Sequence, residues 1–355
     1  MKLGVMTFHQ ALNYGALLQT YALQRYVRTH IPGGDMEVVD YRCPALTALY
    51  STAAQKSGNP VKTVIKTGHF LLKRRCFQGF LKEHIRRSPV AYTPDTIARS
   101  VERYDKFIAG SDQVWNPSLT DGDWNYLLAF APPRKRYAYA ASVGKARFPA
   151  EMEETFCHLL GEFQAISVRE ESAAGMLGDL GLTAQVHIDP VLLLERQEWE
   201  ALCASVAPRR KGYVLVFGVA KSQALVQQAA AYARERGLEV LYIGQHLGNC
   251  PARYIPFLKI QKLLALFRDC EAVFTNSFHG TVLSILFHRP FWAMAQHTDG
   301  RASRITDLLE KLHLSSRTHQ KQLEAPVDWE MVDGVLETLR RQAGEYLEWM
   351  VRDEN

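Results

Sequence analysis

The chain has 355 residues, of which 47% are hydrophobic and 22% are charged. This length is enough for about two domains, and the composition is that of an ordinary globular protein. No apolar run approaches the roughly 18 residues of a membrane-spanning helix. The apolar start of the chain is too short for a signal peptide, so we expect a cytoplasmic protein.

The cysteines argue against two further classes of protein. All six are scattered along the chain, and none forms a Cys-x-x-Cys pair. This distribution argues against a zinc site and against a disulfide framework. The histidines and acids show no metal-ligand spacing either, so we expect no metal and no cofactor.

The first strand is expected at residues 2–7 and the first helix at 16–28. The turn between them contains Asn13 and Gly15, residue types that let a backbone approach a ligand closely. We therefore take both as candidate binding residues, although an ordinary turn explains them equally well. A second short strand is expected at 37–40.

The positive charge belongs to one segment, residues 56–87. This segment holds nine Lys or Arg and one acid, Glu83, giving 9 − 1 = +8, whereas the whole chain carries +5. It lies in an insertion, residues 44–90, whose apolar residues recur at helical spacing. We favour a solvated charged face, and contact with an anionic membrane surface stays open. Nucleic-acid binding is not expected, because no nucleic-acid-binding motif accompanies the charge.

A polar loop, residues 110–117, follows a strand expected at 107–109. Its dense polar groups around a tryptophan suit a sugar, because an indole can stack on a sugar ring while amides and carboxylates bind hydroxyls. The alternative is a simple turn that ends at Pro117. The candidate sugar-binding residues are Ser111, Asp112, Gln113, Trp115 and Asn116.

Further strands are expected at 136–141, 165–168 and 186–188, with helices at 149–163 and 170–180. Arg169 falls at the end of a strand, where it could bind a phosphate or carboxylate with two nitrogens. It could also simply pair with Glu170 or Glu171.

A linker-like stretch at residues 207–212 separates two series of alternating strands and helices. The second series has strands at 213–217, 239–243, 272–274 and 291–293 and helices at 222–236, 257–267, 305–312 and 329–351. This alternation predicts two parallel-sheet domains, 1–206 and 212–325, with a helical tail at 326–355. Ligands would bind in a cleft between the domains, at the carboxyl ends of the strands.

Residues 272–291 are the most informative stretch of the sequence. A buried strand leads into a polar turn and then into an apolar helix that stops at Pro290. His279 would lie in that turn, beside N–H groups that attract anions, which makes it a candidate acid. Most such units carry no chemistry, and Ser277 or Thr281 could simply cap the helix.

Several of these segments together resemble the polysaccharide pyruvyl transferase family, and they span residues 13 to about 312. The resemblance lies in Asn13-Tyr14-Gly15-Ala16-Leu17-Leu18-Gln19, Gly110-Ser111-Asp112-Gln113-Val114-Trp115-Asn116-Pro117, Ser167-Val168-Arg169-Glu170, Asp189-Pro190, Asn276-Ser277-Phe278-His279-Gly280-Thr281 and Pro290-Phe291.

The resemblance implies a glycosyltransferase-B-like fold, in which two Rossmann-like domains face each other across a cleft. It implies transfer of a pyruvyl group from phosphoenolpyruvate to sugar hydroxyls of a surface-polysaccharide or cell-wall glycan precursor, forming a cyclic ketal. His279 matches the position of the family's catalytic histidine, and Arg169 matches an arginine associated with phosphoenolpyruvate.

The donor carries a phosphate and a carboxylate, so at least two cations should converge on it. The candidates are Arg169, Arg301 and Arg304, assisted by Ser277 and by backbone N–H groups near Gly280. Partners would be phosphoenolpyruvate and a glycan or lipid-linked sugar. If the acceptor is lipid-linked, residues 56–87 could hold the enzyme at the inner membrane surface. Two alternatives remain open: a glycosyltransferase using a nucleotide-sugar, and an inactive glycan-binding protein.

Overall fold

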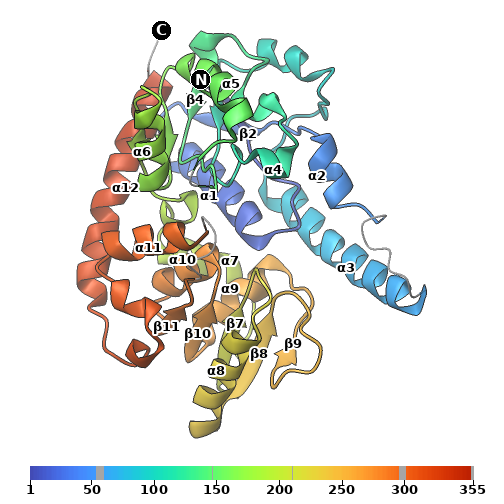
Figure 1. Ribbon diagram of the computed structural model, residues 1–355, viewed down its shortest axis with the longest axis vertical. Coiled ribbons are helices and arrows are strands. Elements are labelled where there is room, and N and C mark those ends of the chain that lie inside the picture. Colours follow the sequence, from blue (N-terminus) through green and yellow to red (C-terminus); the bar gives the residue numbers. More distant parts are fainter. Residues whose placement is uncertain (53–59, 146, 210, 296–300, 353–355) are drawn as a thin grey trace. The chain divides into compact units, whose positions relative to one another are not determined.

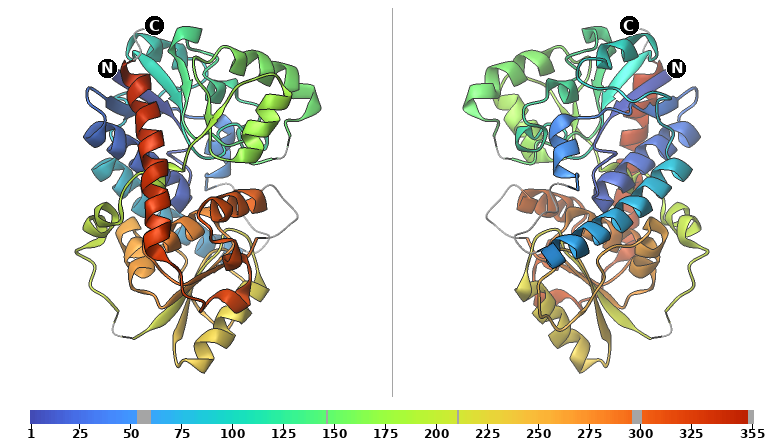
Figure 2. Two further views of the ribbon diagram at one scale, coloured as in Figure 1. Left: turned by 90° about the vertical axis from the view of Figure 1, so that its left-hand side faces the viewer. Right: turned by 90° about the vertical axis from the view of Figure 1, so that its right-hand side faces the viewer.

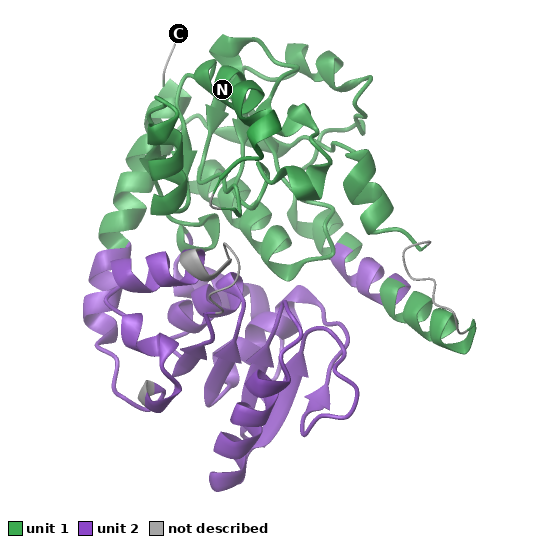
Figure 3. Ribbon diagram, viewed as in Figure 1, with its two compact units in different colours: residues 1–70, 78–193, 337–355 green, residues 71–77, 194–336 purple. Residues whose placement is uncertain are grey.

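The computed structural model describes residues 1–52, 60–145, 147–209, 211–295 and 301–352, without the side chains of 301–303 and 322 (Figure 1). The described chain forms two compact units (Figure 3). Unit 1 comprises Met1–Phe70, Gln78–Leu193 and Glu337–Asn355, and unit 2 comprises Leu71–Phe77 and Leu194–Leu336.

Unit 1 is built on a parallel sheet. Four strands pair in the order β2-β1-β3-β4, and isolated parallel bridges from Tyr137 and Ala141 continue the ladder to the parallel pair β5-β6. All these strands therefore end at one edge, where loops can present functional groups. The strands are β1 (Lys2–Met6), β2 (Asp35–Val38), β3 (Lys106–Ala109), β4 (Arg136–Ala138), β5 (Ser167–Val168) and β6 (Gln185–Val186).

Helices pack on this sheet around a core rich in aromatic residues, which includes Phe107, Trp115 and Tyr126. The helices of unit 1 are α1 (Tyr14–His30), α2 (Pro44–Leu49), α4 (Pro117–Thr120), α5 (Ala150–Gly161) and α6 (Glu171–Asp179). Short 3-10 turns occur at Ile97–Glu102, Trp124–Leu127, Pro133–Lys135 and Pro190–Leu192.

Unit 2 repeats the architecture with a five-stranded parallel sheet in the order β11-β10-β7-β8-β9. Its central strand reads Tyr-Val-Leu-Val-Phe and is buried at every position, as expected for a parallel strand covered on both faces. The strands are β7 (Tyr213–Phe217), β8 (Glu239–Ile243), β9 (Arg253–Tyr254), β10 (Ala272–Thr275) and β11 (Phe291–Ala293). The helices are α7 (Arg196–Cys203), α8 (Gln223–Glu235), α9 (Ile260–Asp269), α10 (Phe278–Leu286) and α11 (Arg301–Lys311), with 3-10 turns at Ser315–Thr318 and Gln320–Gln322.

Two long helices, α3 (Pro60–His84) and α12 (Trp329–Arg352), contribute residues to both units. The second half of α12 belongs to unit 1, because the Tyr346 hydroxyl donates to the carbonyl of Ala138 at 2.8 Å and Arg340 donates to the carbonyl of Leu192 at 2.7 Å. Residues 337–355 are thus part of unit 1 rather than of a separate tail. The division of the chain also falls after Leu193, earlier than the expected boundary at 206.

Several predicted elements differ in their bounds from the structure. The helix expected at 305–312 begins at Arg301, so Arg304 lies inside α11 and not before it. The helix expected at 257–267 begins at Ile260, and the strand expected at 136–141 ends at Ala138. His279 lies in the first turn of α10, not in the turn before the helix, because Ser277 caps the helix and sets its start.

Candidate functional site

His279 is held in the first turn of α10, directly after the carboxyl end of β10. Ser277 is the N-cap, and its side-chain oxygen accepts a hydrogen bond from the backbone N–H of Gly280 at 3.3 Å. Every residue of α10 is buried, and His279 itself is 9% exposed. Its ring makes an edge-to-face contact with Phe278, the centroids lying 5.2 Å apart. The imidazole therefore lies buried at a helix N-terminus, with its ring packed against Phe278.

Gly280 is required for this geometry. A Cβ atom at this position would lie 2.2 Å from the Thr275 side-chain oxygen and 3.0 Å from the ring of Phe217. The Thr275 hydroxyl is itself in use, because it donates to the carbonyl of Phe217 at 2.7 Å and accepts from the N–H of Ser277 at 3.0 Å. The close packing of the loop against β7 thus depends on glycine.

Asn276 fixes the neighbouring loop of the same sheet. Its side-chain oxygen accepts from the N–H of Val219 at 3.0 Å, and its amide donates to the carbonyl of Ala220 at 3.1 Å. Both residues follow β7, so Asn276 joins the loops at the carboxyl ends of β7 and β10. Asn276 was not among the predicted site residues, and its hydrogen bonds hold these two loops together.

The predicted donor-binding arginines of this unit lie in α11, which contacts α10. Arg304 is buried, 7% exposed, within that helix. The side chain of Arg301 lies outside the described residues. A buried guanidinium in the helix adjoining the His279 turn is suited to attract an anion.

In unit 1, Arg169 joins the ends of β5 and β6. It donates to Glu170 at 3.0 Å and to Asp189 at 2.7 Å, and all three side chains are almost completely buried. Burial alone would lower the pKa of Arg169, but the charges of Glu170, Asp189 and Asp112 raise it. The pairing with Glu170 was one of the two sequence interpretations. The structure shows Arg169 as a clamp between two carboxylates, and its binding of the donor stays a prediction.

Ser111 and Asp112 extend this edge to β3. The Ser111 hydroxyl lies 3.2 Å from an Asp189 carboxylate oxygen, so Ser111 joins the Arg169 clamp. Asp112 has a positive φ of 79°, a left-handed conformation that Asp tolerates. Burial, followed by the charge of Asp112, raises the pKa of Tyr50 to about 12. Asp112 is partly exposed, so its carboxylate remains suited to bind a hydroxyl.

The remaining residues of this loop divide into two groups. The amides of Gln113 and Asn116 are hydrogen-bonded to each other at 2.7 Å. Gln113 fits there only because residue 144 is a glycine, whose Cβ would otherwise lie 2.3 Å from the Gln113 side-chain oxygen. Trp115 is 1% exposed, packs edge-to-face on Phe163 and donates to a backbone carbonyl. The prediction that Trp115 stacks on a sugar is therefore wrong, because its indole belongs to the core.

Asn13 is the N-cap of α1, and its side-chain oxygen accepts from the N–H of Gly15 at 2.9 Å. Gly15 is buried, whereas Asn13 is exposed. This capping role accounts for Asn13 without a ligand, in agreement with the ordinary-turn interpretation, and leaves its exposed amide available to one.

Sequence reasoning missed a charge cluster at the ends of β1 and β2. Asp40 accepts from His9 at 3.0 Å, from Gln10 at 2.6 Å, from Arg42 at 3.0 Å and from Arg87 at 3.2 Å. Burial would raise the pKa of Asp40, but His9 and the two arginines outweigh it and hold the pKa at about 2. The signal in the sequence was that His9 follows the first strand and Asp40 follows the second. These two strands are neighbours in the sheet.

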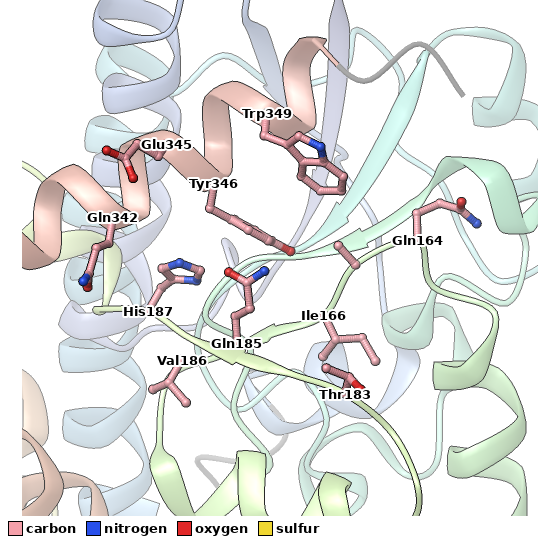
Figure 4. Close-up of a pocket in the computed structure, with 11 residues that line it drawn as sticks. Gln164, Ile166, Thr183, Gln185, Val186, His187, Gln342, Glu345, Tyr346 and Trp349 are labelled. Atoms are coloured by element: carbon pink, nitrogen blue, oxygen red, sulfur yellow. The ribbon is translucent and has the colours of Figure 1, made fainter.

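A cavity of about 710 Å³ lies beside β6 and α12 of unit 1 (Figure 4), where Gln185, His187, Tyr346 and Trp349 project from the two elements. As far as the chain is described, the cavity has none of the predicted site residues in its lining. It is lined by Gln164, Ala165, Ile166, Thr183, Gln185, Val186, His187, Gln342, Glu345, Tyr346 and Trp349.

Solved structures with a similar arrangement of helices and strands show which fold the chain adopts. A UDP-N-acetylglucosamine 2-epimerase is similar over 98% of this chain and 95% of its own, with a TM-score of 0.53 and 10% identity. S. aureus MnaA, in a co-structure with UDP, is similar over 98% of this chain and 96% of its own, with a TM-score of 0.52 and 9% identity. At such identities the likeness concerns the fold alone. The chain has a glycosyltransferase-B-like α/β fold of two Rossmann-like domains, as predicted.

The family follows from the sequence profile of polysaccharide pyruvyl transferases, which matches residues 13–298. The chain therefore belongs to the polysaccharide pyruvyl transferase family, which confirms the resemblance seen in its motifs. No protein of curated function matches the chain.

Proposed function

We propose that this protein transfers the pyruvyl group of phosphoenolpyruvate to two hydroxyls of a glycan, with His279 as the general acid. Family membership supports the reaction class. The observation that carries the role of His279 is its place in the capped first turn of α10, where a single imidazole stands at a helix N-terminus. Such a position attracts an anionic substrate.

The reaction balances with His279 as proton donor. Protonated His279 delivers a proton to C3 of phosphoenolpyruvate, which turns C2 into an oxocarbenium-like centre. A sugar hydroxyl attacks C2, and the C2–O bond to phosphate breaks. A second hydroxyl then closes the ketal. Of the two protons that the hydroxyls lose, one returns to His279 and the other leaves with phosphate.

Binding of the donor rests on groups of unit 2. The phosphate and carboxylate of phosphoenolpyruvate would meet the N-terminus of α10 near Ser277 and Gly280, and also Arg304 and Arg301. Arg169, which also pairs with Asp189 and Glu170, remains a candidate for the donor in unit 1. Asn13, Gly15, Ser111, Asp112, Gln113 and Asn116 remain our candidates for the acceptor sugar, with hydrogen bonds rather than stacking as the mode of recognition.

The test is phosphate release from phosphoenolpyruvate with a panel of lipid-linked and nucleotide-linked sugars. We expect acceptor-dependent release that His279→Gln lowers by about 10²–10⁴-fold, the usual contribution of a general acid. The matched control is His158→Gln, because His158 is an exposed histidine on α5 and should be replaceable without effect.

Three results would overturn the proposal. Full activity of a folded His279→Gln variant would remove His279 from the proton transfer. Calorimetric binding of nucleotide-sugars without binding of phosphoenolpyruvate would instead favour a glycosyltransferase. Retained biological function of the His279→Gln variant would favour a glycan-binding protein without activity.

A further inference from the structure

Helix α3 carries two apolar faces, of which one is buried and one is exposed. Phe70, Phe77, Phe80 and Leu81 are buried, at 2–8% exposure. On the other side, a second set of aliphatic side chains is between 48% and 72% exposed: Val61, Val64, Ile65, Leu71 and Leu72. The sequence predicted one apolar face, since the spacing of all these residues is helical. The structure separates them into two.

The exposed set forms a continuous stripe along the helix. Its members lie at i, i+3, i+4, i+10 and i+11, which places them on one side of an α-helix. The stripe extends about 17 Å, at roughly 1.5 Å per residue. Figure 2 shows α3 as one uninterrupted helix, so the stripe is presented as a single surface. Exposed apolar patches of this kind mark interaction sites.

Basic side chains accompany this stripe. Helix α3 holds six Lys or Arg and one acid, Glu83, which gives 6 − 1 = +5. At about 100° per residue, Arg75 and Lys82 lie on the same side of the helix as the stripe, C-terminal to Leu72. Lys62 and Lys66 lie away from the stripe, towards the side on which Phe70 and Phe77 are buried. All four basic side chains are exposed. The surface therefore combines an apolar stripe with a positively charged margin at its C-terminal end.

We infer that α3 binds the surface of an anionic lipid membrane, with the exposed stripe inserted among the acyl chains and the basic side chains at the headgroups. This is the chemistry of an interfacial amphipathic helix. Within the described ranges, no helix is long and apolar enough to cross a bilayer, so attachment would be peripheral. Each Lys or Arg near such a surface strengthens binding about fivefold.

Other occupants fit this surface less well. A second copy of the chain, related by a two-fold axis, would bring the same positively charged margins together. A nucleic acid would satisfy the charges, but its phosphates would lie against the aliphatic stripe. An anionic membrane matches both the charge and the apolar surface.

Flotation of the purified chain with lipid vesicles tests the inference, using phosphatidylcholine alone and phosphatidylcholine mixed with phosphatidylglycerol. We expect binding to the mixed vesicles that weakens as salt rises, and negligible binding to phosphatidylcholine alone. The double variant Ile65→Asp/Leu72→Asp should weaken binding at least tenfold, because it removes two apolar side chains that would be buried in the membrane. The variant Arg75→Glu/Lys82→Glu should weaken it similarly.

Two matched controls separate the stripe from general surface properties. Val90→Asp changes another exposed aliphatic residue, at 54% exposure, and should leave binding unchanged. Arg99→Glu/Arg134→Glu alters the net charge as much as Arg75→Glu/Lys82→Glu but at exposed residues outside α3, and should cost much less affinity. Thermal unfolding of all variants should match that of the native chain, since each altered side chain is exposed.

Equal, negligible flotation with both vesicles would overturn the inference, as would binding that survives the Ile65→Asp/Leu72→Asp change. A concentration-dependent dimer that this change abolishes would assign the stripe to a second copy. The assay scores binding without turnover, so membrane attachment and the proposed chemistry can fail independently.

Discussion

The carboxyl edges of the two sheets handle charge in opposite ways. In unit 1, the edge holds paired charges: Arg169 between Glu170 and Asp189, and Asp40 among His9, Arg42 and Arg87. In unit 2, the loop between β10 and α10 is built from hydroxyls, a glycine and apolar side chains around His279. One edge neutralises its charges internally, and the other places the imidazole of His279 at a helix N-terminus.

This difference bears on where chemistry takes place. A buried ion pair that is fully satisfied holds loops in place, and it costs stability when one partner is lost. An imidazole at a helix N-terminus can exchange a proton with an anionic substrate. The comparison therefore supports our proposal that His279 transfers the proton while the paired charges of unit 1 position its loops.

The largest expected effect comes from breaking the clamp. Asp189→Asn removes one of the two carboxylates that balance the buried Arg169, and we expect it to lower the free energy of unfolding by about 3 kcal/mol. Asp179→Asn, at an exposed residue of α6, should change it little. Denaturant unfolding measures both.

The same variant can break the comparison. An Asp189→Asn chain of nearly native stability that no longer binds phosphoenolpyruvate would place Arg169 in contact with the donor. The unit 1 edge would then be a binding site for anions and not a clamp.

Close packing of the His279 loop predicts the next effect. Gly280→Ala places a Cβ atom 2.2 Å from the Thr275 side-chain oxygen, and such overpacking costs about 1–3 kcal/mol. Because the loop must shift, we also expect acceptor-dependent phosphate release to fall more than donor affinity. Gly175→Ala in α6, where nothing lies within 4 Å of the added atom, should instead be slightly stabilising.

An unchanged rate for Gly280→Ala at unchanged stability would contradict this account. The turn would then be adaptable, and the fixed position of His279 would no longer distinguish unit 2 from unit 1.

The Asp40 cluster predicts a dependence of stability on acid. The pKa of Asp40 is lowered from 3.8 to about 2. Its contribution to the free energy of unfolding is therefore fully present above pH 3.8 and is lost as the pH falls through 2. The contribution is about 2 kcal/mol. Asp40→Asn should therefore lower the free energy of unfolding at neutral pH by about this amount and flatten its decline between pH 4 and pH 2. Asp95→Asn, at an exposed residue, is the control.

A decline in stability that Asp40→Asn leaves as steep as before would show that other carboxylates carry the acid response. The charge cluster at the ends of β1 and β2 would then be a weak surface network.

Much of the fold could be predicted from hydrophobic patterns. The bounds expected for β7, β8 and β11 agree with the structure, because continuous apolar strands between turn residues are unambiguous. Helix α7 and the two-residue strand β9 were missed, because neither has enough apolar residues to produce a pattern.

Site residues were harder to predict, because their roles depend on contacts between distant segments. Trp115 was predicted to stack on a sugar because its neighbours in the sequence are polar, yet its indole is buried in the core. His9 and Asp40 are 31 residues apart and meet only because β1 and β2 are adjacent. The exposed stripe of α3 shares its helical spacing with the buried face, and spacing alone does not say which side a neighbour covers.

The smallest expected effect concerns Asn13, which serves as a cap and remains a candidate ligand. Asn13→Ala should destabilise α1 by about 1 kcal/mol, the usual cost of a lost N-cap, whereas Asn13→Ser should restore most of that stability because serine also caps. If acceptor affinity follows stability in both variants, Asn13 acts through the helix alone. If Asn13→Ser is stable but binds the acceptor sugar several-fold more weakly, the exposed amide contacts the sugar. The second result would give the unit 1 edge a direct part in recognition, beside its paired charges.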